Sequence, residues 1–222
     1  MCGRFYRHEI SWDEYHASLS IIQPDGVEAP EAKYNVAPMS FAPIIKPREH
    51  GQTGNELIPA QWSLVPSWWR KPLSEKKFST FNARSETVNE ANSFKGSFRH
   101  FRCLVPMSGY YEWSAPKVPF AITMRNRRWF CVAGLWNRVM IEGSELDTFT
   151  ILTTDPNDAT AGIHSRMPVI IYPEDYERWM RAPYQEVFDL MKPCAAADID
   201  AWPVKPDVGN VRNQGPELIE EA

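Results

Sequence analysis

The chain has 222 residues, 43% of them hydrophobic and 13% aromatic, and a formal net charge of −4 at pH 7. This composition excludes a disordered protein, and the length suits a single domain, residues 1–222, with a sizeable core. No apolar run reaches membrane-spanning length and no signal segment opens the sequence, so we expect a soluble protein of the cytoplasm.

The four cysteines are widely scattered through the sequence. They form no C-x-x-C pair and have none of the spacings that are typical of metal ligands. The pattern predicts free thiols in a reducing compartment, with neither a metal site nor another cofactor. The cysteines are Cys2, Cys103, Cys131 and Cys194.

Positive charge is concentrated in the middle of the chain. Residues 60–140 contain 13 Lys and Arg against 4 Asp and Glu, whereas the rest of the chain is acidic. Such side chains can be dispersed over a solvated surface. If they gather on one face, they form the electrostatic footprint of a protein that meets phosphates.

Short apolar runs rich in Val, Ile, Phe, Trp and Thr predict many β-strands, and 19 prolines disfavour long helices. We therefore expect a mixed α+β fold: one strand-dominated domain whose sheet is curved or barrel-like, with a few peripheral helices. The expected strands are residues 42–46, 57–63, 101–107, 110–113, 119–124, 128–135, 148–153, 168–172 and 201–204.

Helices are expected to be few. Ser11 followed by Glu14 resembles a capping box, which predicts a helix to about Ser20. A helix after Pro173 has that proline in its first turn. This helix is expected at residues 174–181, and the remaining two are one that starts at residues 87–90 and one at 184–192.

The second residue carries the most chemical information. Removal of Met1 would make Cys2 the N-terminus, with a primary amine and a thiol on one residue. Such a 1,2-aminothiol closes on an aldehyde to give a five-membered thiazolidine. An α-amine with a pKa of about 7.7–8.0 is roughly one-quarter neutral near physiological pH, and therefore nucleophilic. A Cys after Met is nevertheless common in proteins that do not use it.

An Asn and an Arg stand two residues apart in Asn82-Ala83-Arg84, a stretch that is expected to be extended. Side chains two residues apart in a strand share a face. Asn82 can orient a substrate oxygen, and Arg84 can bind a phosphate with two N–H groups. A purely structural Asn turn is the alternative.

Glu112 lies between aromatic residues in Gly109-Tyr110-Tyr111-Glu112-Trp113. Aromatic surroundings raise the pKa of a carboxyl group by desolvation, which suits it to acid–base catalysis near neutral pH. The alternative is an ordinary strand Glu whose carboxylate is in solvent.

His164 is expected in a loop before a buried strand, in Gly162-Ile163-His164-Ser165-Arg166. Binding and catalytic residues concentrate in loops, and an imidazole can carry a proton at physiological pH. An ordinary surface or core histidine is the alternative. The adjacent Ser165 does not indicate a serine hydrolase, because the chain has no G-x-S-x-G elbow.

Two adjacent tryptophans, Trp68 and Trp69, are followed by Arg70 and Lys71. Aromatic side chains beside cations in an expected loop are typical of a base-stacking platform next to phosphate contacts. Most of the nine tryptophans are expected in the core, and these two are the exceptions.

In this order the motifs resemble the SOS-response-associated peptidase (SRAP) family, the abasic-site processing proteins. The resemblance extends over essentially the whole chain, and the order of the motifs is more specific than any single motif. It rests on Met1-Cys2-Gly3-Arg4-Phe5, Tyr34-Asn35-Val36-Ala37-Pro38, Trp68-Trp69, Asn82-Ala83-Arg84-Ser85-Glu86, Gly109-Tyr110-Tyr111-Glu112-Trp113 and His164-Ser165-Arg166-Met167-Pro168.

The resemblance implies a protein that binds single-stranded DNA, associates with the nucleoid when bound, and attacks abasic sites through Cys2. The resulting cross-link would shield the lesion. We expect a monomer with no membrane partner. The implied catalytic set is Cys2, Asn82, Glu112 and His164, and DNA contacts are assigned to Arg4, Asn35, Pro38, Trp68, Trp69, Arg84, Trp113 and Arg166.

A mechanism follows as a hypothesis. His164 donates a proton to the ring oxygen of the sugar, and the Cys2 amine adds to C1′. Glu112 protonates the departing hydroxyl, and the Cys2 thiolate closes the ring, while Asn82 holds a sugar hydroxyl or the amine. Intramolecular closures reach effective molarities of about 10⁵–10⁸ M, so capture by sulfur should outrun β-elimination.

Two other functions remain open from the sequence. One is a cysteine peptidase or N-terminal-nucleophile amidohydrolase, with Cys2 as nucleophile and His164 as base. The other is a non-catalytic single-stranded-DNA-binding module in which Cys2 has no role. The sequence also leaves open whether Met1 is released by self-cleavage or by an aminopeptidase.

Overall fold

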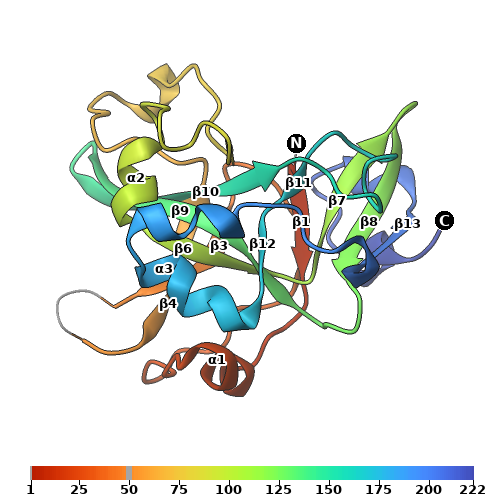
Figure 1. Ribbon diagram of the computed structural model, residues 1–222, viewed down its shortest axis with the longest axis horizontal. Helices are drawn as coiled ribbons and strands as arrows, with labels where there is room; N and C mark the ends of the chain where they lie inside the picture. The colour runs from red at the N-terminus through yellow and green to blue at the C-terminus, as the bar shows by residue number, and fades with distance from the viewer. Residues whose placement is uncertain (1, 49–51) are drawn as a thin grey trace.

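Two β-sheets pack against each other in the computed structural model, which describes residues 2–48 and 52–222 (Figure 1). The first sheet contains, in spatial order, β13 (Ile199–Pro203), β8 (Val118–Met124), β7 (Gly109–Ser114), β1 (Arg4–Arg7) and β2 (Lys33–Val36). The second contains β11 (Met167–Pro168), β10 (Ser144–Thr154), β4 (Asn55–Trp62), β3 (Phe41–Pro47), β6 (Arg102–Met107), β9 (Phe130–Ile141) and β12 (Ile170–Ile171), with β5 (Asn82–Arg84) beside β10.

The strand-dominated fold expected from the sequence is confirmed, and each expected strand overlaps an observed one. The expected strand at 168–172 is divided into β11 and β12 on either side of Val169. β1 and β2 were not among the expected strands. Both are short and carry cationic or amide side chains, which interrupt the apolar run that predicts a strand.

The helices are few and short, and two of the four expected ones are wrong. α1 (Trp12–Leu19) has the expected capping box at Ser11, and α3 (Tyr176–Arg181) continues the 3₁₀ turn η2 (Pro173–Asp175). Residues 184–192 instead form two 3₁₀ segments, η3 (Tyr184–Glu186) and η4 (Phe188–Leu190), because the intervening Val187 departs from helical geometry. Residues 87–90 make a single turn, and the helix α2 (Lys95–His100) begins later. The remaining 3₁₀ segments are η1 (Leu73–Glu75), η5 (Ala196–Asp198), η6 (Pro206–Gly209) and η7 (Pro216–Ile219).

The central core is shared by both sheets. Phe5 of β1 and Tyr110 of β7 belong to the same buried cluster as Trp62 of β4 and Phe149 of β10. The rings of Trp62 and Phe149 are stacked, with centroids 6.2 Å apart. Cys2 belongs to this cluster and is fully buried. The N-terminal strand therefore delivers the thiol into the interior between the sheets.

No helix within the described ranges is long and apolar enough to cross a bilayer. All four cysteines are free and buried. Residues 2–48 and 52–222 contain no cluster of three or more His, Cys, Asp or Glu side chains that could hold a metal ion. Met1, whose removal the sequence analysis expects, lies outside the described residues.

Candidate functional site

Pairing between β1 and β7 brings the N-terminal residues alongside Glu112. In this antiparallel pair Arg4 is opposite Tyr111 and Tyr6 is opposite Gly109. A Cβ atom at Gly109 would lie 2.3 Å from the Tyr6 ring, so glycine is required for this close pairing. Cys2, two residues before Arg4, lies close enough to Glu112 for this carboxyl group to raise the pKa of the thiol.

Asn82 contacts the main chain of Cys2 directly. β5 runs parallel to β10, with Asn82 beside Ile151, and this pairing fixes the position of the amide. Asn82 Nδ2 donates a hydrogen bond to the carbonyl oxygen of Cys2 at 2.7 Å. In this structure the N–H of the amide therefore orients Cys2 itself, and the sequence-based role of Asn82 toward a sugar hydroxyl or the amine stays a prediction.

Glu112 is a buried carboxyl group, with an exposed fraction of 3%. Desolvation by burial is the largest effect on it and raises its pKa to about 7. Glu112 Oε1 lies 3.9 Å from Nδ1 of His164. A carboxyl group with this pKa can both donate and accept a proton near neutral pH.

His164 is held by the main chain of its own loop. The backbone N–H of Arg166 donates to His164 Nδ1 at 3.0 Å, and the N–H of His164 donates to the carbonyl of Thr160 at 3.0 Å. Burial lowers the pKa of His164, which favours the neutral ring. Because Nδ1 accepts a hydrogen bond, we assign the proton of the neutral ring to Nε2.

The Cys2 thiol is protonated in this environment. Burial, and next the nearby Glu112, raises the pKa of the thiol far above its ordinary value. Cys2 Sγ lies 3.9 Å from the carbonyl oxygen of Arg4, to which it can donate. The sequence-based mechanism used a thiolate, but the geometry favours a neutral thiol that must lose its proton during the reaction.

The four candidate catalytic residues are thus brought together from distant parts of the sequence: Cys2, Asn82, Glu112 and His164. Sequence reasoning missed the residues that position them. The glycine at the start of the Gly109-Tyr110-Tyr111-Glu112-Trp113 motif was the only available signal for the close β1–β7 pairing.

The candidate DNA contacts fall into two groups, and the side chains of the first are exposed or half-buried. Arg84 is exposed at the end of β5, and no hydrogen bond or ion pair is formed by its guanidinium within the described residues. Trp68 is 52% exposed and stacks on Phe78, with ring centroids 6.2 Å apart. Pro38 lines a hollow with Phe78 and Met39. Trp69 is half-buried against a small apolar cluster.

The second group makes internal contacts. Arg4 Nη1 donates to Asn35 Oδ1 at 2.7 Å and to the carbonyl of Val208 at 2.8 Å. Asn35 is 3% exposed, and its Nδ2 donates to carbonyls of the C-terminal segment. The Arg4 guanidinium lies 6.0 Å from the Trp113 ring. These residues attach the C-terminal segment to β1 and β2, and as DNA contacts they stay predictions.

Arg166 also makes internal contacts. Its guanidinium forms two hydrogen bonds to the Glu86 carboxylate, at 2.8 and 2.9 Å, and a third to Asp155 at 2.9 Å. A further bond reaches the carbonyl of Thr153 at 2.7 Å. Since its backbone N–H orients His164, this network fixes the histidine loop, whereas DNA binding by Arg166 stays a prediction.

The cationic side chains in the middle of the sequence are of two kinds in the structure, those with partners inside the protein and those that are exposed. Arg125, Arg128 and Arg138 pair with acidic side chains, and Arg102 is buried against main-chain carbonyls. The exposed cations of residues 70–99 belong to the gold to yellow-green segment around α2 at the upper left of Figure 1. They are Arg70, Lys71, Lys77, Arg84, Lys95 and Arg99.

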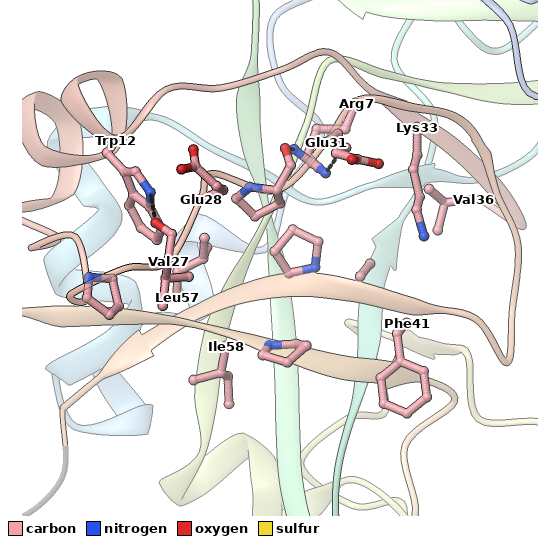
Figure 2. A pocket seen from close by; sticks show the side chains of 15 residues that line it. Arg7, Trp12, Val27, Glu28, Glu31, Lys33, Val36, Phe41, Leu57 and Ile58 are labelled. Atoms are coloured by element: carbon pink, nitrogen blue, oxygen red, sulfur yellow. Dashed lines mark hydrogen bonds between the residues drawn. The ribbon is translucent and has the colours of Figure 1, made fainter.

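A separate cavity of about 390 Å³ lies against the β3–β4 hairpin (Figure 2). Its walls are mainly apolar and include Trp12, Phe41, Leu57 and Ile58. A hydrogen bond from Arg7 to the carbonyl of Glu31 closes one side. None of the four candidate catalytic residues lines it, so the candidate chemistry belongs to the cysteine site.

Comparison with known families identifies the family of this chain. The family model described as SOS response associated peptidase (SRAP) matches residues 1–211. The chain belongs to the SRAP family. The resemblance inferred from the sequence motifs is thereby confirmed, and the strand-dominated fold is shared with a solved bacterial protein.

Two curated bacterial relatives of this SRAP chain match it over almost their whole length. It is 35% identical over 234 residues to "Abasic site processing protein YoqW" of Bacillus subtilis, covering 99% of each chain. It is 31% identical to "Abasic site processing protein YedK" of Escherichia coli, again covering 99% of each. A solved protein from Bacteroides thetaiotaomicron has a TM-score of 0.78 and 28% identity, and the match covers 97% of this chain and 92% of that one.

Proposed function

We propose that this SRAP protein processes abasic sites by forming a covalent thiazolidine with them in single-stranded DNA, through the amine and thiol of Cys2. The proposal rests on one observation above all: Cys2 lies beside a buried carboxyl group, Glu112, whose pKa is raised to about 7. It is supported by the curated relatives, which are named abasic site processing proteins. Release of Met1 is required, because an acylated nitrogen on Cys2 is not nucleophilic.

The first stage joins the amine to the sugar. The ring-opened abasic site exposes an aldehyde at C1′, and the neutral amine of Cys2 adds to it to form a carbinolamine. The protonated Glu112 gives its proton to the hydroxyl, which leaves as water, so that an iminium ion and a carboxylate remain. In this stage Nε2–H of the neutral His164 would donate a hydrogen bond to a sugar oxygen.

The second stage closes the ring. The sulfur of Cys2 bonds to C1′, the π electrons of the C=N bond move to nitrogen, and the thiol proton passes to the Glu112 carboxylate. Glu112 is therefore restored to its acid form, and the net change is the loss of one water without oxidation or reduction. Asn82 supports both stages because it fixes the Cys2 carbonyl and so limits rotation of the reacting residue.

DNA would be bound beside this site by two kinds of contact. The exposed guanidinium of Arg84 and its cationic neighbours supply a salt-dependent attraction to phosphates. The exposed ring of Trp68, on its Phe78 support, supplies stacking that does not depend on base identity. We expect a preference for unpaired DNA, because stacking on a side chain requires an unstacked base.

The test is incubation with a single-stranded oligonucleotide in which a uracil has been excised, followed by denaturing electrophoresis and intact mass. We expect a covalent species whose mass is the sum of the mature protein and the oligonucleotide less one water. Cys2→Ala should abolish it, and Cys2→Ser should leave at most a reversible adduct. Cys131→Ala removes another buried thiol, in a different core cluster, and should cross-link normally.

The two alternative functions predict different results for the same set of variants. A peptidase would turn over a fluorogenic peptide in the absence of DNA and lose that turnover in Cys2→Ala. A non-catalytic DNA-binding module would bind the oligonucleotide equally well with or without Cys2 and give no covalent species. A normal cross-link in Cys2→Ala would contradict the proposal.

A further inference from the structure

The hydroxyl group of Tyr110 is buried and has no hydrogen-bond partner among the described residues. Tyr111, the next residue, is equally buried, but its hydroxyl donates to the carbonyl of Tyr34 at 2.8 Å. Buried hydroxyl groups are almost always paired, because an unpaired one loses its hydrogen bonds to water without compensation. An unpaired hydroxyl beside a reactive residue therefore points to a group that becomes a stronger hydrogen-bond acceptor during the reaction.

The register of the sheet places Tyr110 next to the candidate site. Tyr110 and Glu112 are two residues apart on β7, so their side chains share one face of the strand. Tyr110 lies opposite Phe5 of β1, and it belongs to the same buried cluster as Cys2. Burial, followed by the nearby Cys2, Cys194 and Glu112, raises the pKa of Tyr110 well above its usual range, so that the hydroxyl keeps its proton.

Ring closure needs a donor to sulfur that neither the Arg4 carbonyl nor the committed Asn82 amide provides, and the His164 ring is assigned to a sugar oxygen. The sulfur must gain negative charge as its proton leaves, and its surroundings disfavour a thiolate. Its contact in this structure is the carbonyl of Arg4, which is an acceptor. The amide N–H of Asn82 is already committed to the Cys2 carbonyl. The Tyr110 hydroxyl is a buried donor that remains uncommitted within the described part of the chain.

We propose that Tyr110 donates a hydrogen bond to the Cys2 sulfur while the thiazolidine ring closes, and that it thereby positions and stabilises the attacking sulfur. This inference rests on the proposed cross-linking function. Tyr110 keeps its proton throughout. The S–C1′ bond forms, the C=N π electrons pass to nitrogen, and the thiol proton goes to the Glu112 carboxylate, so the step remains balanced. Tyr110 is a positioning residue that acts through Cys2.

The experiment separates imine formation from ring closure in Tyr110→Phe, using protein whose intact mass establishes that Met1 is absent. Cyanoborohydride added at early times traps the imine, and untrapped samples report the thiazolidine. We expect imine formation to stay within about twofold of the unsubstituted protein. Ring closure should slow by about 10²-fold or more, the lower end of what one donor to a developing negative charge contributes.

A second measurement needs no DNA. The rate of Cys2 alkylation by iodoacetamide is followed against pH, with the other cysteines resolved by peptide mapping. Without a donor to sulfur, the profile of Tyr110→Phe should shift to higher pH. Tyr111→Phe is the matched control: it removes a hydroxyl that is already paired, so it should lower thermal stability but leave the alkylation profile and the ring-closure rate unchanged.

The outcomes are distinguishable. Equal slowing of both stages in Tyr110→Phe, together with an unshifted alkylation profile, would mean a purely structural role and would overturn the inference. Unchanged ring closure would overturn it as well. If the unsubstituted protein formed no thiazolidine at all, the proposed function would fail, and the alkylation profile alone would still decide whether Tyr110 acts on the Cys2 sulfur.

Discussion

The side-chain amide of Asn82 donates a 2.7 Å hydrogen bond to the main-chain carbonyl of Cys2. These residues are 80 positions apart in the sequence. Asn82 begins β5, which pairs with the second sheet, and Cys2 comes shortly before β1 of the first sheet. The bond holds the reactive residue by its backbone and leaves both its nitrogen and its sulfur available for chemistry. In the proposed mechanism this amide therefore positions the reacting residue.

Replacement of Asn82 by Ala should slow cross-linking without abolishing it. The Cys2 backbone would gain rotational freedom, and small losses of positioning cost about tenfold to a hundredfold in rate. The rate of covalent adduct formation at saturating abasic oligonucleotide measures this. Asn137→Ala is the matched control, because Asn137 Nδ2 donates a similar buried bond to the carbonyl of Val65, at 2.8 Å, in another part of the molecule. If the control slowed cross-linking as much as Asn82→Ala, the positioning role would be wrong.

The pH dependence of cross-linking should be bell-shaped. Loss of the hydroxyl requires protonated Glu112, whose pKa is raised to about 7, whereas addition requires the neutral amine, whose ordinary pKa is about 7.7–8.0. The rate should therefore rise with pH as the amine loses its proton and fall as Glu112 ionises. Glu112→Gln should remove the falling limb and lower the maximum by about 10²–10⁴-fold. A falling limb that persists in Glu112→Gln would assign it to another group.

Arg84 and Arg166 should behave differently in DNA binding. Arg84 is exposed, whereas Arg166 is engaged by Glu86 and Asp155. Arg84→Ala should weaken binding of single-stranded DNA and reduce the slope of log K against log salt by about 0.7, the value for one phosphate contact. Arg166→Met should leave that slope unchanged and instead slow cross-linking, because the His164 loop loses its anchor.

Arg127→Ala removes an exposed cation from the β8–β9 connection and serves as the control for net charge. Salt-dependent binding is measured for all three variants by fluorescence anisotropy with an intact oligonucleotide. If the slope of log K against log salt fell as much in Arg166→Met as in Arg84→Ala, Arg166 would also be a phosphate contact.

Substitutions of the two adjacent tryptophans should also have different effects on DNA binding and on stability. Trp68 is 52% exposed, and its loss should weaken single-strand binding by about 1–3 kcal/mol with little effect on unfolding. Trp69 packs against the cluster of Val65, Val139 and Ile141, so Trp69→Ala should cost stability. The cost should be on the order of 2 kcal/mol, below the roughly 3–5 kcal/mol of a fully buried aromatic residue. Parallel denaturant unfolding and DNA titration of both variants test this division.

Much of the fold can be predicted from the sequence because most of the strands are marked by local apolar runs. Apolar runs such as Phe101–Met107 predict β6 almost to the residue, and the capping box at Ser11 predicts α1. β1 has no such apolar run, since two of its four residues are arginines. It forms because β2 and β7 pair with it on both sides, and such pairing at long sequence separation is invisible in a local window.

The candidate site is predictable in its residue types but not in their roles. Glu112 could be assigned a raised pKa from its aromatic neighbours, and burial has that effect here. The polar chemistry of Arg4, Asn35 and Arg166 gave no indication that their hydrogen bonds are made within the protein. Whether a guanidinium faces a phosphate or a carbonyl depends on the tertiary arrangement, and one sequence does not encode it locally.

The buried Glu112 carboxyl should also make stability depend on pH. Its pKa is raised from an ordinary 4.5 to about 7, so the folded protein retains a proton that the unfolded chain has already lost between these values. The stability that the protonated carboxyl contributes is complete below about pH 4.5 and is lost as the pH rises through about 7. By linkage the loss is on the order of 3 kcal/mol, at about 1.4 kcal/mol per pKa unit.

Glu112→Gln cannot ionise and should escape this loss. Its Tm should equal that of the unsubstituted protein near pH 4.5 and exceed it increasingly up to about pH 8. Calorimetry across this range measures the difference, with Glu174→Gln, an exposed carboxyl on η2, as the control that should show no such divergence. Parallel Tm curves for Glu112→Gln and the unsubstituted protein would mean that Glu112 ionises as easily in the fold as in the unfolded chain. The carboxyl would then be largely ionised at neutral pH and poorly suited to donate the proton that removes the hydroxyl, so the same measurement bears on the chemistry as well as on the fold.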